Sequence, residues 1–311
     1  MATAFLFPGQ GSQSVGMGYE LYEQNDEARA RFEAANELLD VDLLTLMFGL
    51  DASLDDPEEQ LKQTAVTQPA LYTHSLAAMA VLQARGVAPD MTAGHSLGEY
   101  SALAAAGALS FEDGLRVVRR RGELMAEAGE RRPGAMAAIM GADDEDVEAG
   151  CEAASAEGEG VVQPANYNAP GQVVISGDEA AVERATARIK GRAIPLPVSG
   201  AFHSPLMEYA REGLGEVLAA VTIDEPDCPV YLNVTAEPTT DPDEIRRCLM
   251  EQLLSPVRWA QLLRRMHADG ATRFVEVGAG DVLRGLVGRT LGDDVETAGA
   301  GTPDDIDALT G

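Results

Sequence analysis

The sequence has few cysteines, few lysines and no long apolar run. Its three cysteines, Cys151, Cys228 and Cys248, are scattered over 311 residues without paired metal-ligand spacing. We therefore expect neither a disulfide framework nor a zinc site, and we expect the protein to work in a reducing cytoplasm. Glycine, serine or charged residues interrupt every apolar stretch well before the roughly 20 residues that a membrane-spanning helix needs. The first ten residues lack a basic region followed by a long apolar one, so we predict no signal peptide.

Basic residues are scarce relative to acidic ones. The chain has 23 Lys and Arg against 51 Asp and Glu, a formal net charge of −28. A field of that sign repels nucleic acid and anionic lipid, so neither is an expected partner. Only Lys62 and Lys190 are lysines. An acidic, lysine-poor surface suits concentrated salt, where screening removes self-repulsion, and we hypothesise a salt-rich cytoplasm. Because no heptad pattern or apolar stripe is visible, we expect a monomer.

Strand and helix patterns alternate along most of the chain, which predicts an α/β fold with a mostly parallel sheet. Strands are expected at 3–7, 89–96, 228–234 and 273–280. Helical patterns are expected up to about residue 50, at 67–86 with Pro69 in the first turn, and at 97–107, with an acidic loop at 51–60. The tail, 292–311, is acidic and rich in small residues, and we expect a loosely held terminus.

The sequence pattern changes between residues 129 and 197. A strand, a helix, a hairpin around 168–171, a second helix and a last strand follow in turn. The order β-α-β-β-α-β is that of a ferredoxin-like unit. Because α/β patterning resumes afterwards, we predict an insert at 129–197 within a catalytic core formed by 1–128 and 198–311.

The segment "GHSLGEYSAL" places Ser96 between Gly94 and Gly98, after a predicted strand and before a predicted helix. The pattern G-x-S-x-G in that context predicts a sharp turn that exposes a nucleophilic hydroxyl.

A serine nucleophile needs a base within hydrogen-bond reach, and the sequence has four histidines. His95 is expected to turn away from its neighbour and pack against the adjacent strand. His74 and His267 are expected to be packed or capping residues. His203 follows a strand end, where α/β proteins place functional groups, and is the preferred candidate.

An arginine lies on the apolar side of the predicted helix containing "RVVRRRGELM". At about 100° per residue, Arg121 falls among apolar residues, whereas Arg116, Arg119 and Arg120 face the opposite side. Burying a guanidinium is costly unless an anion meets it. The sequence leaves open whether that anion is an internal carboxylate or a ligand carboxylate.

"FPGQGSQ" is glycine-rich but lacks the features of a phosphate-binding or dinucleotide-binding loop. Its glycines favour close approach of the backbone to a ligand, with an N–H available to an oxyanion.

Six blocks in order, "FPGQGSQ", "GHSLGEYSAL", "RRRGELM", "NYNAPGQVVISG", "GAFHSPLM" and "EQLLSPVRW", closely resemble malonyl-CoA:acyl carrier protein transacylases over roughly residues 4–290. The resemblance implies an α/β-hydrolase-like core with a ferredoxin-like insert. It implies transfer of malonyl from malonyl-CoA to the phosphopantetheine thiol of acyl carrier protein, for fatty-acid chain elongation, by a ping-pong mechanism without metal or redox cofactor.

The resemblance also implies roles for individual residues. Ser96 would be the nucleophile and His203 its base, with backbone N–H groups of Gln10 and Leu97 forming the oxyanion hole. Arg121 would bind the malonyl carboxylate. The histidine would be oriented by the main-chain carbonyl of Gln252 and with help from Asn168. Phe202 would disfavour an α-methyl branch, a discrimination of about 1–3 kcal/mol.

Two other readings stay open at this point. An esterase or thioesterase shares G-x-S-x-G but ordinarily has an acid between serine and histidine, and a histidine near the C-terminus. A scaffold subunit of an acyl-carrier system would keep the fold without turnover. Two basic clusters could dock an acidic carrier protein, or could be solvated surface: Arg184, Arg188, Lys190 and Arg192, or Arg284 and Arg289.

Overall fold

A six-stranded sheet forms the centre of the molecule in the computed structural model, which describes residues 2–39, 41–51, 56–198 and 200–311. Its order is β10-β9-β1-β2-β7-β8, and all neighbours are parallel except β7 and β8. The strands are β1 (Ala2–Phe7), β2 (Met91–Gly94), β7 (Val230–Tyr231), β8 (Pro238–Thr239), β9 (Ala271–Val277) and β10 (Glu296–Ala300). The predicted α/β class with a mostly parallel sheet is confirmed.

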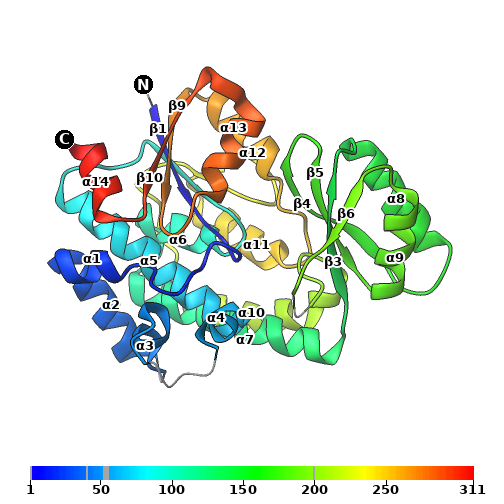
Figure 1. Ribbon diagram of the computed structural model, residues 1–311, viewed down its shortest axis with the longest axis horizontal. Helices are drawn as coiled ribbons and strands as arrows, with labels where there is room; N and C mark the ends of the chain where they lie inside the picture. Colours follow the sequence, from blue (N-terminus) through cyan, green and yellow to red (C-terminus); the bar gives the residue numbers. More distant parts are fainter. Residues whose placement is uncertain (1, 40, 52–55, 199) are drawn as a thin grey trace.

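Helices cover both faces of this sheet (Figure 1). Alternate residues of β1 enter two different cores. Phe5 and Phe7 pack with the helices of one face, whereas Ala4 and Leu6 pack with α12 and α13 on the other. The helical elements are α1 (Tyr19–Gln24), α2 (Asp26–Leu38), α3 (Leu43–Phe48), α4 (Pro57–Lys62), α5 (Thr64–Ala84), α6 (Gly98–Ala105), α7 (Phe111–Arg131), η1 (Pro205–Met207), α10 (Glu208–Ala220), α11 (Pro242–Gln252), α12 (Trp259–Ala268), α13 (Val282–Leu291), η2 (Gly292–Asp294) and α14 (Pro303–Thr310).

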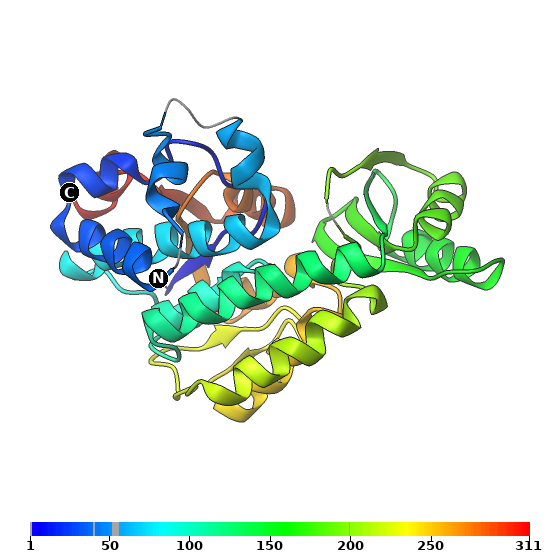
Figure 2. The same cartoon turned by 90° about the horizontal axis from the view of Figure 1, so that it is seen from below.

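The insert has its own antiparallel sheet, in the order β4-β5-β3-β6. Its elements are β3 (Ala135–Met140), α8 (Asp144–Ala156), β4 (Val162–Ala169), β5 (Gln172–Gly177), α9 (Glu179–Arg188) and β6 (Arg192–Pro195). This is the predicted βαββαβ unit. Figure 2 shows the long helix α7 running from the core to the insert. Because α7 continues to Arg131, the first three residues of the predicted insert are part of a core helix.

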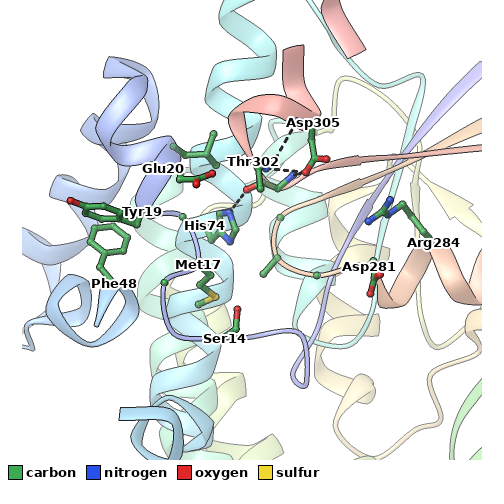
Figure 3. Close-up of a pocket in the computed structure, with 17 residues that line it drawn as sticks. Ser14, Met17, Tyr19, Glu20, Phe48, His74, Asp281, Arg284, Thr302 and Asp305 are labelled. Atoms are coloured by element: carbon green, nitrogen blue, oxygen red, sulfur yellow. Dashed lines mark hydrogen bonds between the residues drawn. The ribbon is translucent and has the colours of Figure 1, made fainter. Parts of the chain in front are cut away.

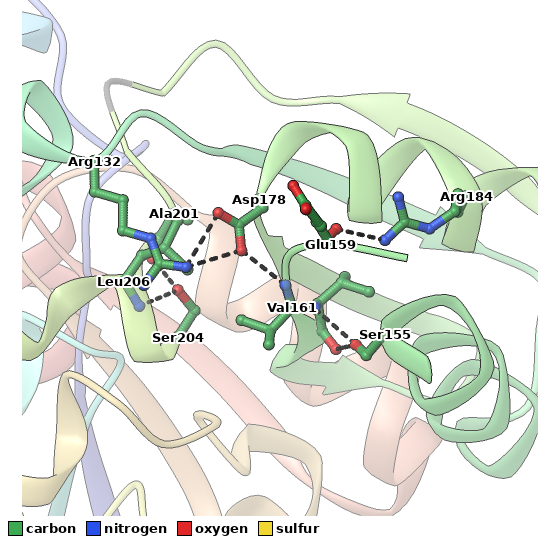
Figure 4. A network of polar contacts seen from close by, with 10 residues as sticks. Arg132, Ser155, Glu159, Val161, Asp178, Arg184, Ala201, Ser204 and Leu206 are labelled. Carbon is green, nitrogen blue, oxygen red and sulfur yellow. Dashed lines mark hydrogen bonds and ion pairs between the residues drawn. The ribbon is translucent and has the colours of Figure 1, made fainter. Parts of the chain in front are cut away.

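A polar network joins the end of α7 to the insert (Figure 4). Both carboxylate oxygens of Asp178, which precedes α9, accept from Arg132 Nη2, at 3.2 and 3.1 Å. The backbone N–H of Val161 donates to the same carboxylate at 2.7 Å. The start of β4 and the start of α9 are therefore held against the helix that enters the insert.

Strand β4 also contacts the core directly. Val257, just before α12, donates its N–H to Ala165 O at 2.8 Å and accepts from Tyr167 N at 2.9 Å. Asn166 forms an isolated parallel bridge with Val257. These main-chain contacts fix β4 beside the core, so residues of β4 can serve as part of a site wall.

The prediction of a loosely held tail at 292–311 is wrong. Residues 296–300 form β10, which pairs in parallel with β9, and α14 follows. Ala300 and Ile306 are fully buried, and Arg85 forms an ion pair with Asp307. A Cβ at Gly301 would lie 2.3 Å from the carbonyl oxygen of Gly278. The small residues of the tail therefore reflect close packing rather than weak packing.

Helix α5 begins at Thr64, so Pro69 lies inside the helix and not in its first turn as predicted. Proline has no N–H to donate to Ala65 O. Arg119 of α7 donates to that carbonyl at 3.3 Å instead, which satisfies the freed acceptor. The predicted acidic loop at 51–60 lies partly outside the described residues, and α4 occupies the part from Pro57. None of the helices within the described residues combines the length and apolarity needed to cross a bilayer.

Candidate active site

Ser96 occupies a sharp turn between β2 and α6, with φ of 51°. Left-handed backbone is unfavourable for a residue other than glycine, and such strain concentrates at functional sites. A Cβ at Gly94 would lie 1.9 Å from the carbonyl oxygen of Gly98, and a Cβ at Gly98 would lie 2.0 Å from that of Phe7. The two glycines of the motif therefore allow strand, turn and helix to cross at contact distance.

Gly98→Ala is expected to distort this turn, because its Cβ would meet backbone rather than a movable side chain. We expect a loss of at least about 3 kcal/mol in the free energy of unfolding and loss of covalent labelling at Ser96. Urea unfolding and mass spectrometry would measure the two effects. Gly288→Ala is the control, because a Cβ there meets nothing within 4 Å. A Gly98→Ala enzyme that matched this control would contradict the close packing.

Asn233, which follows β7, holds the turn from the other side. Its Oδ1 accepts from the Ser96 N–H at 2.7 Å, and its Nδ2 donates to Gly94 O at 2.7 Å. Both main-chain groups would otherwise lack partners in the bent segment. Sequence analysis missed this residue, although its position near the carboxyl end of the strand predicted at 228–234 was a usable signal, because α/β proteins place functional groups at that edge of the sheet.

His203 reaches the serine from the loop before η1. Its Nε2 lies 2.8 Å from Ser96 Oγ, and its Nδ1 lies 2.8 Å from the main-chain oxygen of Gln252. Since a carbonyl can only accept, Nδ1 carries the proton and Nε2 presents its lone pair to the serine. Burial, with the positive charge of Arg121 nearby, lowers the pKa of His203 to about 3. The imidazole is therefore neutral at pH 7 and able to accept a proton.

The backbone of His203 is itself left-handed, with φ of 56°. Gln163 of β4 donates through Nε2 to His203 O and to Leu254 O, both at 2.9 Å. A side chain of the insert thus fastens the loop that carries the histidine to the segment after α11.

Arg121 of α7 is buried next to the serine, with 1% of its surface exposed. Its Nη1 donates to Gln68 Oε1 at 2.8 Å, while Nη2 donates to Gln252 Oε1 at 2.9 Å and to Ser96 Oγ at 3.1 Å. Among the described residues no carboxylate lies within ion-pair distance of this guanidinium. Of the two anions left open by the sequence, the geometry favours a ligand carboxylate. The remaining arginines of the run pair with acidic residues of their own helix, as expected for a solvated face: Arg116, Arg119 and Arg120.

Two residues that line the cavity beside Ser96, Gln10 and Leu97, have backbone N–H groups without a hydrogen-bond acceptor among the described residues. The loop after β1 approaches the turn closely, because a Cβ at Gly9 would lie 2.4 Å from His95 O. The arrangement can stabilise an oxyanion formed at the serine.

The cavity at Ser96 has a volume of about 130 Å³. Core residues form most of its wall, and the insert and the segment after β6 supply the rest. The lining residues are Gln10, His95, Ser96, Leu97, Arg121, Met125, Met136, Asn166, Leu196, Val198, Phe202 and His203. Phe202 is buried and lines this cavity.

The predicted role of Asn168 in orienting His203 is wrong. Asn168 Oδ1 lies 2.8 Å from Nε2 of His95, and its partner is thus the other histidine. His95 also packs edge-on against Trp259 of α12. Because successive side chains at the turn point apart, His95 faces the insert while Ser96 faces His203.

The two remaining histidines lie outside the cavity at Ser96: His74 is packed, and His267 is half-buried near the end of α12. His74 is buried with Nε2 3.0 Å from Gly301 O, and His267 Nδ1 lies 2.9 Å from Ala271 O. His74 lines a second, larger cavity of about 520 Å³, together with residues such as Ser14 and Arg284 (Figure 3). None of the residues Ser96, His203 and Arg121 lines that cavity, so the smaller one contains the candidate chemistry.

His74 is expected to make the fold sensitive to acid. Burial lowers its pKa to about 4 in the folded state, whereas the unfolded chain titrates near 6.5. The unfolded state alone therefore takes up a proton between these values, and stability falls as pH decreases through that window. Between pH 7 and 5, the protein should lose about 2 kcal/mol more unfolding free energy than His74→Gln does. Urea unfolding at both pH values measures this difference, and equal losses would contradict it.

Comparison with known proteins gives a family for this geometry. A family model described as "Acyl transferase domain" matches residues 4–304. The chain is 50% identical over 288 residues to the malonyl CoA-acyl carrier protein transacylase of Bacillus subtilis, covering 91% of this chain and 89% of that protein.

Solved structures agree with the sequence comparison. The acyl carrier protein S-malonyltransferase of Vibrio cholerae aligns with a TM-score of 0.92 and 42% identity, covering 99% of this chain and 100% of that one. A second structure, a type II PKS acyl-carrier protein in complex with its malonyl-transacylase, aligns with a TM-score of 0.92 and 38% identity, covering 100% of this chain and 99% of that one. The serine turn, His203, Arg121 and the core with its insert fit this family. The family model and the curated relative show that this chain belongs to the malonyl CoA-acyl carrier protein transacylases, within the acyl transferase domain family.

Proposed function

We propose that this protein transfers a malonyl group from malonyl-CoA to the phosphopantetheine thiol of an acyl carrier protein, and so supplies fatty-acid chain elongation. One observation carries the proposal: Ser96 Oγ lies 2.8 Å from a neutral imidazole and 3.1 Å from a guanidinium that has no carboxylate partner among the described residues. A nucleophile and a site for an acyl group with a free carboxylate therefore share one cavity.

In the first half-reaction, Ser96 Oγ bonds to the thioester carbonyl carbon while its proton passes to Nε2 of His203. The tetrahedral oxyanion accepts hydrogen bonds from the N–H groups of Gln10 and Leu97. The carbon–sulfur bond then breaks, and the imidazolium returns its proton to the departing CoA sulfur. The second half-reaction runs the same steps in reverse, with the carrier thiol as nucleophile.

Arg121 would bind the malonyl carboxylate, because the planar guanidinium suits a carboxylate and is already held by Gln68 and Gln252. Phe202 would narrow the cavity where an α-methyl branch would lie. Gln252 would contribute its main-chain oxygen to the orientation of His203, in the place that a carboxylate takes in serine proteases.

The carrier protein would dock beside β6. The side chains of Lys190 and Arg192 are exposed and form no hydrogen bond or ion pair with other described residues. Strand β6 leads directly to Leu196 and Val198 in the cavity wall.

The other members of the predicted clusters all have partners. Arg188 is paired with Glu157, and Arg184 donates to main-chain carbonyls. Arg284 lies 3.8 Å from Glu276, and Arg289 donates to Gln172.

Reversing both free charges, with Lys190→Glu and Arg192→Glu, should raise the KM for carrier protein about fivefold or more at low salt. The KM for malonyl-CoA should change little, because both residues lie outside the cavity lining. Steady-state kinetics at two salt concentrations would measure both constants. Arg273→Glu on β9 is the control for each single reversal, because it changes the net charge by the same two units as Lys190→Glu or Arg192→Glu alone. A rise in KM for carrier protein as large in Arg273→Glu as in those single variants would overturn this docking surface.

Covalent labelling tests the proposed function. Incubation with malonyl-CoA should add one malonyl group to Ser96, detected by peptide mass spectrometry, and a pantetheine thiol should remove it. Rapid release to water in the absence of thiol would indicate an esterase or thioesterase. Absence of labelling would indicate a scaffold subunit.

A further inference from the structure

Glu99 is a buried carboxylate with no part in the reaction steps above. It lies in the first turn of α6, three residues after Ser96, and its side chain is fully buried. A buried carboxylate is costly unless hydrogen bonds compensate it. Its surroundings therefore show what it holds in place.

Two donors converge on one oxygen of Glu99. Oε2 accepts from the side-chain Nε2 of Gln252 at 2.8 Å and from the backbone N–H of Asn233 at 3.2 Å. Oε1 has no partner in the described part of the chain. The carboxylate thus contacts the two residues that also hold His203 and the serine turn.

The contact to Gln252 decides which way that amide faces. A carboxylate oxygen accepts, so the amide must direct its NH₂ group towards Glu99. The same NH₂ group donates to Ser96 O at 3.0 Å, and the amide oxygen is left to accept from Arg121 Nη2 at 2.9 Å. A reversed amide would set NH₂ against guanidinium, two donors facing each other, and would displace the guanidinium.

The acceptor, rather than the negative charge, is what this geometry requires. Burial raises the pKa of Glu99 to about 7, opposed by the hydrogen bonds from Gln252 and Asn233. A proton placed on the unpartnered Oε1 leaves both hydrogen bonds to Oε2 intact. A glutamine at position 99 would likewise keep its oxygen towards the two donors.

We infer that Glu99 is a positioning residue that acts through the side-chain amide of Gln252 to aim the guanidinium of Arg121 at the substrate carboxylate. The inference rests on the proposed function, because it assumes that Arg121 binds the malonyl carboxylate. It assigns to the glutamate of "GHSLGEYSAL" selectivity for the acyl group rather than a share in proton transfer.

Two variants of similar length separate the acceptor from the rest of the side chain. Glu99→Gln retains an acceptor oxygen, and Glu99→Met removes it. The readout is the ratio of kcat/KM for malonyl-CoA to that for acetyl-CoA, since acetyl has no carboxylate. We expect the ratio to fall at least about tenfold in Glu99→Met and to stay within about threefold of the parent in Glu99→Gln.

Gln252→Met tests the connection, because it removes the amide while leaving the main-chain oxygen that binds His203. This variant should lose selectivity to a similar degree, and adding Glu99→Met to it should cause little further loss, since the two changes break one path. It also keeps the inference testable if Glu99→Met does not fold. Glu276→Gln is the control: this buried carboxylate accepts from the N–H groups of Leu283 and Arg284, outside the cavity.

Three results would overturn the inference: equal falls for malonyl and acetyl transfer in Glu99→Met, losses that multiply in the double variant, or an unchanged ratio in Gln252→Met. Failure of the proposed function is distinct, because the parent enzyme would then form no malonyl–Ser96 adduct at all.

Discussion

Ser96→Ala is expected to abolish the covalent malonyl-enzyme and to reduce transfer to carrier protein on the order of 10⁶-fold, as removal of the nucleophile does in serine proteases. The reason is that Ser96 Oγ is the hydroxyl within hydrogen-bond distance of both the His203 imidazole and the Arg121 guanidinium. Intact-mass measurement after incubation with malonyl-CoA detects the adduct, and a carrier-protein assay measures the rate.

Ser101→Ala is the matched control for this prediction. Ser101 lies on α6, is equally a serine near the turn, and its buried hydroxyl has no hydrogen-bond partner among the described residues. We expect labelling and turnover close to those of the parent. A malonyl adduct that survived in Ser96→Ala would place the nucleophile elsewhere.

Arg121→Ala is expected to lower kcat/KM for malonyl-CoA on the order of 10²- to 10³-fold, the range for truncating one partner of a buried, hydrogen-bonded charge pair. Transfer of acetyl should fall much less, because acetyl presents no carboxylate to the missing guanidinium. The comparison of the two acyl donors under identical conditions is the measurement.

Arg116→Ala provides the control on the same helix, because Arg116 is exposed and pairs with Asp113 on the surface. It should leave both kcat/KM values unchanged. Equal losses of malonyl and acetyl transfer in Arg121→Ala would assign the arginine a structural role. Those losses could then be traced to the hydrogen bond from Nη2 to Ser96 Oγ.

The architecture was largely predictable from periodicity. The order of the elements in the insert, and the strand and helix on either side of Ser96, followed from apolar patterns and turn residues. The tail was the exception, because composition alone does not distinguish a loose terminus from a strand that packs closely. Gly301, for example, approaches the backbone of Gly278, a contact that depends on β9 being nearby. The start of α5 was misplaced because Pro69 normally marks a first turn, and a distant Arg119 compensates for it here.

The site was predictable where a residue's role depends on its own segment. The sharp turn at Ser96 and the position of Arg121 on the apolar side of its helix both followed from the local sequence pattern. The roles of residues that act through tertiary contacts did not follow from the local pattern. Asn233 holds the serine turn from the loop after β7, and Gln163 contacts His203 from the insert. Asn168 was assigned to the wrong histidine, because the direction in which His95 points is set by Trp259 and β4.

The carbonyl behind His203 has a consequence for which nucleophile completes the cycle. The hydrogen bond to that carbonyl keeps the proton on Nδ1, so Nε2 is a proton acceptor, while burial and the nearby charge of Arg121 lower the pKa of His203. A thiol, with a pKa of about 8.5, gives up its proton to such an acceptor far more readily than water, whose pKa is about 15.7. An incoming thiol therefore competes better than water for the bound acyl group, which conserves the activated three-carbon unit for its intended acceptor.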